Sequence, residues 1–89
     1  MTAERVARIE ALLTDAFSPV HLLVKDQSHL PAGHEGARDC GGHFDVTIVA
    51  EAFAGKRPLA RHRMVYDALA SMMPADIHAL RIDASEPTT

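Results

Sequence analysis

The sequence is poor in cysteine and in aromatic residues: its 89 residues include one cysteine, no tryptophan, one tyrosine and three phenylalanines. A lone cysteine cannot form an internal disulfide, which predicts a reducing compartment, the cytoplasm. So few aromatic side chains cannot provide a stacking surface for bases. No stretch approaches the roughly 20 apolar residues of a membrane-spanning helix. The net charge of −3 gives no general electrostatic reason to expect a nucleic acid.

The composition is that of an ordinary globular chain, with 47% hydrophobic and 24% charged residues. Its length predicts a single domain spanning residues 1–89. Histidine is the exception, because the chain carries six, four of them between His29 and His62. This number of histidines is the unusual feature of the composition.

The N-terminal half predicts a helix, a strand and a long loop. An apolar stripe at helical spacing gives an amphipathic helix that ends at Ser18-Pro19, formed by Val6, Ile9, Leu12, Leu13, Ala16 and Phe17. Val20, Leu22 and Val24 then alternate with other residues, as in a strand. The segment 26–42, DQSHLPAGHEGARDCGG, holds four of the five glycines and has no apolar period. We expect it to be a loop between two antiparallel strands, and loops of this length are usually functional or disordered.

The segment 42–83 predicts a strand, a helix and a second strand. Alternate apolar residues from Phe44 to Ala50 predict a strand with one buried face. Pro58 suits the first turn of a helix, and Met73-Pro74 is expected to stop it. The apolar face of this helix is predicted to comprise Leu59, His62, Val65, Tyr66, Leu69, Met72 and Met73. Ile77 to Ala84 alternates again, so the two strands should be parallel.

The predicted order is therefore α-β-β-α-β, an α+β sandwich in which a three-stranded mixed sheet carries both helices on one face. This arrangement is that of type II K-homology domains and a few small relatives. A fold of this kind does not by itself define a function.

The motifs in this segment resemble those of the BolA-like family. A His-Phe strand, an F-x-G turn, an R-H-R-M-V-Y helix start and an I-H-A-L strand occur in order within GHFDVTIVAEAFAGKRPLARHRMVYDALASMM and IHALRI. The loop segment SHLPAGHEGA and the Phe17-x-Pro19 element are also similar to those of the family. The resemblance covers residues 4–84, and the combination is specific although each word alone is weak.

The resemblance implies a role in iron–sulfur chemistry. BolA-like proteins bind monothiol glutaredoxins and share with them a bridging [2Fe–2S] cluster, to which the glutaredoxin contributes its cysteine and a bound glutathione. The family histidine of the I-H-A-L strand corresponds to His78. The second ligand comes from the loop before the second strand, where both Cys40 and His34 are available. Some bacterial members have been treated as DNA-binding transcriptional regulators, and this role is the alternative function for the chain.

The chemistry of the residues agrees with a shared cluster. Such a cluster needs four ligands, usually thiolates and sometimes imidazoles, so a chain with one thiol needs a partner. Asp39 beside Cys40 should raise the pKa of the thiol, which favours a ligand over a catalytic nucleophile. The sequence has no Ser-His-Asp set, no paired carboxylates in a defined context and no phosphate loop, so we expect no enzyme. Alone, the chain should be a monomer or a weak homodimer.

Each candidate ligand also has a structural interpretation. His78 shares parity with Leu80 and Ile82, so residue pattern alone favours a core histidine. Cys40 is otherwise an incidental loop thiol and His34 a solvated loop residue. His62 falls on the apolar stripe and is assigned to structure, with a backbone carbonyl as its partner.

Two rival kinds of site use other residues. The basic residues Lys56, Arg57, Arg61 and Arg63 are either a solvated helix start or a contact for an acidic partner or nucleic acid. A K-homology interface needs a G-x-x-G loop, which Gly33–Gly36 matches only in letters, so we expect weak, salt-sensitive DNA binding at most. A zinc site from His29, His34, Cys40 and His43 has irregular spacing and ranks low.

Overall fold

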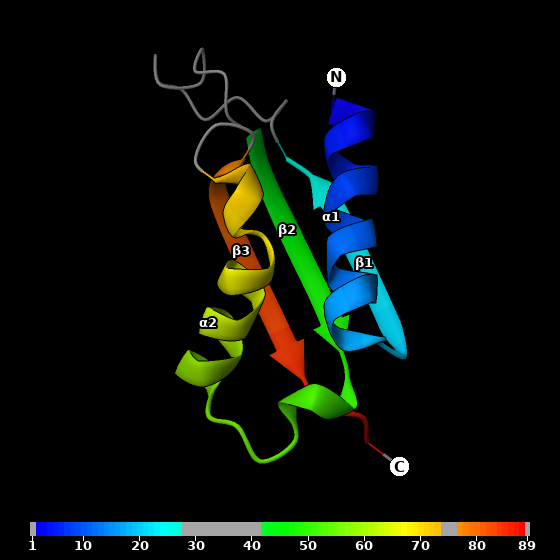
Figure 1. Ribbon diagram of the computed structural model, residues 1–89, viewed down its shortest axis with the longest axis vertical. Coiled ribbons are helices and arrows are strands. Elements are labelled where there is room, and N and C mark those ends of the chain that lie inside the picture. Colours follow the sequence, from blue (N-terminus) through cyan, green and yellow to red (C-terminus); the bar gives the residue numbers. More distant parts are fainter. Residues whose placement is uncertain (1, 28–41, 74–76, 89) are drawn as a thin grey trace.

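The computed structural model describes residues 2–27, 42–73 and 77–88 and has two helices on one face of a three-stranded sheet (Figure 1). The chain runs through α1 (Thr2–Phe17), β1 (His21–Asp26), β2 (Gly42–Val49), α2 (Pro58–Ala68) and β3 (Ile77–Ser85). Two short 3₁₀ helices, η2 (Glu51–Phe53) and η3 (Ala70–Met72), flank α2. The predicted element order and fold class are confirmed.

The sheet has the order β1-β2-β3, with β2 in the centre. β1 is antiparallel to β2, and β3 is parallel to β2, as the strand–helix–strand pattern predicts. Along β2, Phe44, Val46 and Ile48 are buried while the residues between them are half-buried on the opposite face. This period of two is what a strand with one face in the core requires.

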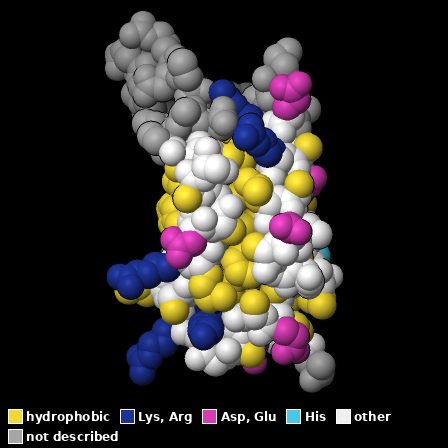
Figure 2. All heavy atoms as spheres, viewed as in Figure 1, with side chains coloured by type: hydrophobic (Ala, Val, Ile, Leu, Met, Phe, Trp, Pro, Cys, Tyr) yellow, Lys and Arg dark blue, Asp and Glu magenta, His cyan; other side chains and the backbone are white. Residues whose placement is uncertain are grey.

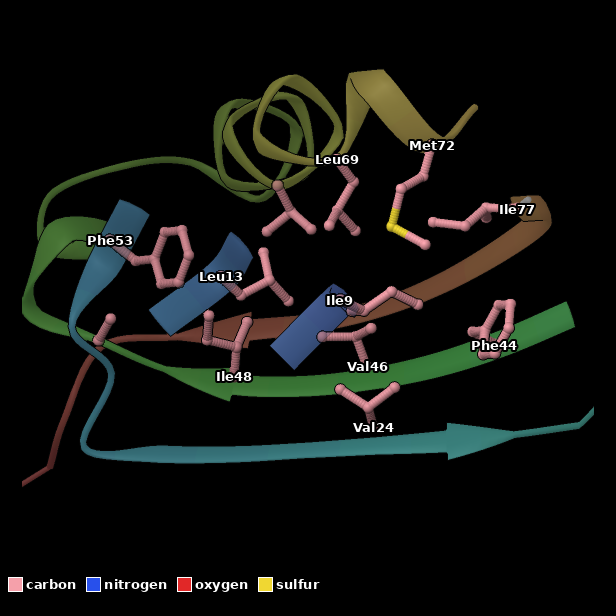
Figure 3. Close-up of a cluster of buried hydrophobic side chains, with 12 residues drawn as sticks. Ile9, Leu13, Val24, Phe44, Val46, Ile48, Phe53, Leu69, Met72 and Ile77 are labelled. Atoms are coloured by element: carbon pink, nitrogen blue, oxygen red, sulfur yellow. The ribbon is translucent and has the colours of Figure 1, made fainter. Parts of the chain in front are cut away.

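The core lies between the helices and the sheet, and Figure 3 shows side chains from both layers pointing toward one another. Its buried members are Ile9, Leu13, Val24, Phe44, Val46, Ile48, Ala50, Phe53, Val65, Leu69, Met72 and Ile77. Partly buried hydrophobic side chains surround them, and some show as the yellow strip between the two helices in Figure 2. The methionine set behaves as predicted, because Met72 is buried and Met64 and Met73 pack against the core.

The second helix is shorter than its sequence predicts. The α-helix ends at Ala68, not at Met73. At that end the N–H of Leu69 is shared between the carbonyls of Val65 and Tyr66, each at 3.1 Å. The chain then continues as the 3₁₀ helix η3, where Met72 N donates to Leu69 O at 2.9 Å. Tightening into 3₁₀ geometry is a common way to end an α-helix.

The buried face of α2 also differs from the predicted stripe. Val65, Leu69 and Met72 are buried as expected, but Leu59 is 65% exposed, Tyr66 is 38% exposed and His62 is exposed. At 100° per residue, Tyr66 and Leu59 lie about 100–120° around the helix from Val65. The part of the α2 surface that packs on the sheet is therefore narrower than the predicted apolar face. The assignment of His62 to the core face was wrong.

Candidate functional site

The N-terminal ends of β2 and β3 lie side by side because these strands are parallel. In the register, Gly42 pairs with Ile77 and His43 pairs with Ala79. One step along β2 therefore corresponds to two steps along β3, and His78 is the additional residue. The irregularity changes the parity of β3, so that Ile77 is buried in the core while Leu80, Ile82 and Ala84 pack against it further along. Ile77 therefore lies on the same face as Leu80 and Ile82, although its number has the opposite parity.

Of the three predicted ligands, His78, Cys40 and His34, the structure describes the backbone of His78. Cys40 and His34 lie outside the described residues, and so do the Gly33–Gly36 motif and His29. Gly42, two residues after Cys40 in the sequence, is buried and begins β2. In residues 2–27, 42–73 and 77–88, no three His, Cys, Asp or Glu side chains come together in a way that could hold a metal ion.

The face of the sheet opposite the helices carries charges of both signs. Asp45 on the central strand has Lys25 and Arg81 as its register partners on either side. The carboxylate also accepts a hydrogen bond from the Gln27 amide, with Nε2 and Oδ2 3.3 Å apart. A groove of about 270 Å³ runs along this face between Asp45, Thr47, Arg81 and Asp83. Charges that alternate in this way offer no net attraction to a polyanion.

The predicted basic residues divide into two groups. Lys56, Arg57 and Arg63 are exposed in the turn before α2 and on α2 itself, and Figure 2 shows Lys and Arg side chains gathered at the lower left, where α2 begins. Arg61 instead is 18% exposed and turned toward the end of β3. The exposed group is therefore three side chains, not four.

Arg61 is bound within the protein. Its Nη1 donates to the carbonyl oxygen of Ala84 at 3.2 Å, and its Nη2 lies 3.5 Å from Oε1 of Glu86. The same carboxylate oxygen accepts a hydrogen bond from the N–H of Gly55 at 3.4 Å. Glu86 thus connects the turn before α2 to the segment after β3. Sequence reasoning missed Glu86, because nothing in the local pattern relates it to a turn 31 residues earlier.

Comparison with known families agrees with this architecture. The profile of the family described as BolA-like protein matches residues 13–89. Because the match covers most of the sequence, this chain belongs to the BolA-like family. Among solved structures, the BolA domain of SufE1 from Arabidopsis thaliana has a TM-score of 0.80 at 40% identity and covers 93% of this chain and 92% of that one. Mouse BolA1 has a TM-score of 0.74 at 38% identity, with 92% and 64% covered.

Curated relatives carry two kinds of name. The DNA-binding transcriptional regulator BolA of Vibrio cholerae is 46% identical over 74 residues, which is 83% of this chain and 67% of that protein. SufE-like protein 1, chloroplastic/mitochondrial, of Arabidopsis thaliana is 40% identical over 88 residues, and the chain spans only 24% of its length. Within the described segments, no helix has both the length and the apolar character to cross a bilayer. Since some relatives are chloroplastic or mitochondrial, the cytoplasm stays a prediction.

Proposed function

We propose that this chain is a non-catalytic adaptor that assembles, transfers or senses iron–sulfur clusters together with a monothiol glutaredoxin. The supporting observation is the register at the start of the sheet, where Gly42 pairs with Ile77, the neighbour of His78. Two Cα–Cα steps, at most about 7.6 Å, connect Gly42 to Cys40. The imidazole and the thiol are far apart in the sequence. Each nevertheless belongs to a residue within two positions of the pair formed by Gly42 and Ile77.

The chemistry of a shared cluster suits this incomplete set. A [2Fe–2S] cluster takes four ligands, and histidine can replace cysteine on one iron. His78 with Cys40, or with His34, provides two of them. The glutaredoxin cysteine and its glutathione provide the others, so the cluster is a cargo held between two proteins. The role of this chain is to hold its half of the ligands at one end of the sheet.

The test is reconstitution with a partner. Mixing the chain with a reconstituted monothiol glutaredoxin and glutathione should give a heterodimer with a changed visible circular dichroism spectrum. His78→Ala should abolish the change, whereas His62→Ala, at an exposed position on α2, should leave it intact. Cys40→Ser and His34→Ala then identify the second ligand. The proposal fails if the isolated chain holds stoichiometric iron and sulfide, or if no complex with glutaredoxin forms.

A second function, DNA-binding transcriptional regulation, is favoured by the names of the bacterial relatives and by the exposed cations at the start of α2. Each phosphate contact contributes about 0.9 to the slope of log K against log salt. Lys56→Ala with Arg57→Ala should therefore lower the slope by about 2. His78→Ala should leave DNA affinity unchanged. A slope that the double variant does not alter would exclude this surface.

A further inference from the structure

The two edges of the sheet are protected to different degrees. Along β3, the N–H and C=O groups of Leu80, Ile82 and Ala84 point away from β2, because the intervening residues bond to it, as Ser85 O does to Ala50 N. Two of these outward carbonyls are occupied from α2. Tyr66 donates its hydroxyl to Leu80 O at 3.4 Å, and Arg61 donates to Ala84 O at 3.2 Å. Side chains of α2 therefore obstruct the addition of a strand beside β3.

Within the part of the chain that the structure describes, no side chain covers the edge at β1 in a comparable way. Gln27 N donates to His43 O at 2.7 Å, which assigns the odd-numbered residues of β1 to the ladder with β2. Leu22 and Val24 therefore direct their N–H and C=O groups outward, and no partner for them occurs among residues 2–27, 42–73 and 77–88. Leu23 between them is 43% exposed, and Val20 just before the strand is 69% exposed. An unpaired edge with exposed apolar side chains is a template for another strand.

We propose that β1 pairs with β1 of a second copy of this chain, antiparallel and about a twofold axis at Leu23. In this register, Leu22 of each copy exchanges two hydrogen bonds with Val24 of the other, four in all. Leu23 then stands directly opposite its counterpart on the face away from the helices, and the two exposed leucines cover each other. Lys25 lies opposite His21 of the other copy. In this register, therefore, no two lysines and no two carboxylates stand directly opposite each other.

We assign the strand that pairs with the β1 edge to a second copy of the chain because this edge is complementary to itself. The run Leu22-Leu23-Val24 is apolar on both sides of its centre, and a twofold pairing satisfies the outward groups of both copies at once. Each chain has one usable edge, since α2 obstructs the β3 edge. Pairing therefore closes at a dimer and cannot continue into a filament. An interface of one short strand falls in the small class, so association is weak and concentration-dependent. This inference does not depend on the proposed cluster function.

Sedimentation velocity across a concentration series, from about 10 µM to about 1 mM as expected for a small interface, tests the proposal. The chain should shift from monomer to dimer within this range. Leu23→Lys, which puts two ammonium groups face to face without altering the core, should weaken dimerisation at least tenfold. Leu59→Lys, the matched change at the exposed leucine of α2, should have no effect. A monomer at every concentration, or a dimer insensitive to Leu23→Lys, overturns the proposal.

Cross-linking tests the register. In a Cys40→Ser background, Leu23→Cys should form a disulfide-linked dimer under mild oxidation, because directly opposed residues of a non-hydrogen-bonded pair lie about 4.5 Å apart at Cα. His21→Cys is the control, since two copies of residue 21 would be separated by roughly 13 Å along the strands. Equal cross-linking of both variants, or faster cross-linking at residue 21, contradicts the twofold axis at Leu23.

Discussion

Arg61 donates a hydrogen bond to the carbonyl oxygen of Ala84 at 3.2 Å, which ties the first turns of α2 to the end of β3. The Arg61 side chain is 18% exposed, and its Nε is buried without a hydrogen-bond partner among the described residues. Its position results from packing as well as from charge, because the aliphatic part of an arginine can cover apolar surface.

Replacing Arg61 should therefore lower stability more than replacing an exposed arginine. We expect Arg61→Ala to reduce the free energy of unfolding by about 1–3 kcal/mol, since a hydrogen bond from a charged group and part of its packing are lost. Arg63→Ala, on the exposed side of the same helix, should change it by less than about 0.5 kcal/mol. Urea unfolding of both variants measures the difference. Equal effects would mean that the bond to Ala84 contributes nothing.

The second prediction concerns the link between the end of α1 and η2. The rings of Phe17 and Phe53 lie 5.0 Å apart at their centroids, inclined at 43°, and Phe53 is fully buried. Phe53→Ala should lower the free energy of unfolding by about 3–5 kcal/mol because it leaves a cavity. Phe17→Ala should cost less, since that ring is partly exposed. Because the residues are in contact, the double variant should cost less than the sum of the two single changes.

The third prediction follows from backbone strain at the end of α1. Ser18 has φ of +47°, and its N–H donates to Thr14 O at 2.9 Å as the helix ends. A left-handed residue at this point is usually glycine, so Ser18→Gly should stabilise the protein by about 0.5–1 kcal/mol. Thermal unfolding measures the change. The converse control is Gly55→Ala, at φ +76° with open space around a Cβ, which should destabilise through backbone conformation alone.

The sheet and the order of elements could be predicted because the strands have a period of two, which in β3 holds from Ala79 onward. Phe44, Val46 and Ile48 illustrate this, since alternation alone assigns them to the buried face. The C-terminal end of α1 and the start of α2 were equally clear, because Pro19 and Pro58 are strong local signals. These features are determined by residues close to one another in the sequence, so a local pattern is enough to predict them.

The site was harder to predict because it depends on contacts between distant segments. The register irregularity at His78 arises from how β3 fits against β2, and no local pattern reveals it. The contact of Glu86 with Arg61 and Gly55 joins segments 25 and 31 residues apart. Charge alone suggested that Arg61 belongs to a basic surface. In the structure its side chain is mostly buried and contacts Ala84 and Glu86. Cys40 and His34 lie outside the described residues, so their roles stay predictions.

The fourth prediction tests the face of α2 directly. His62 was assigned to the core from its spacing, yet it is exposed, while Val65, three residues later, is fully buried. His62→Ala should therefore change the free energy of unfolding by less than about 0.5 kcal/mol. Val65→Ala should lower it by about 2 kcal/mol, because two buried methyl groups are removed and the core cannot fully close around the gap. Denaturant titration of both variants at one pH decides between the two faces. A larger loss at His62 than at Val65 would mean that α2 is rotated from the orientation described.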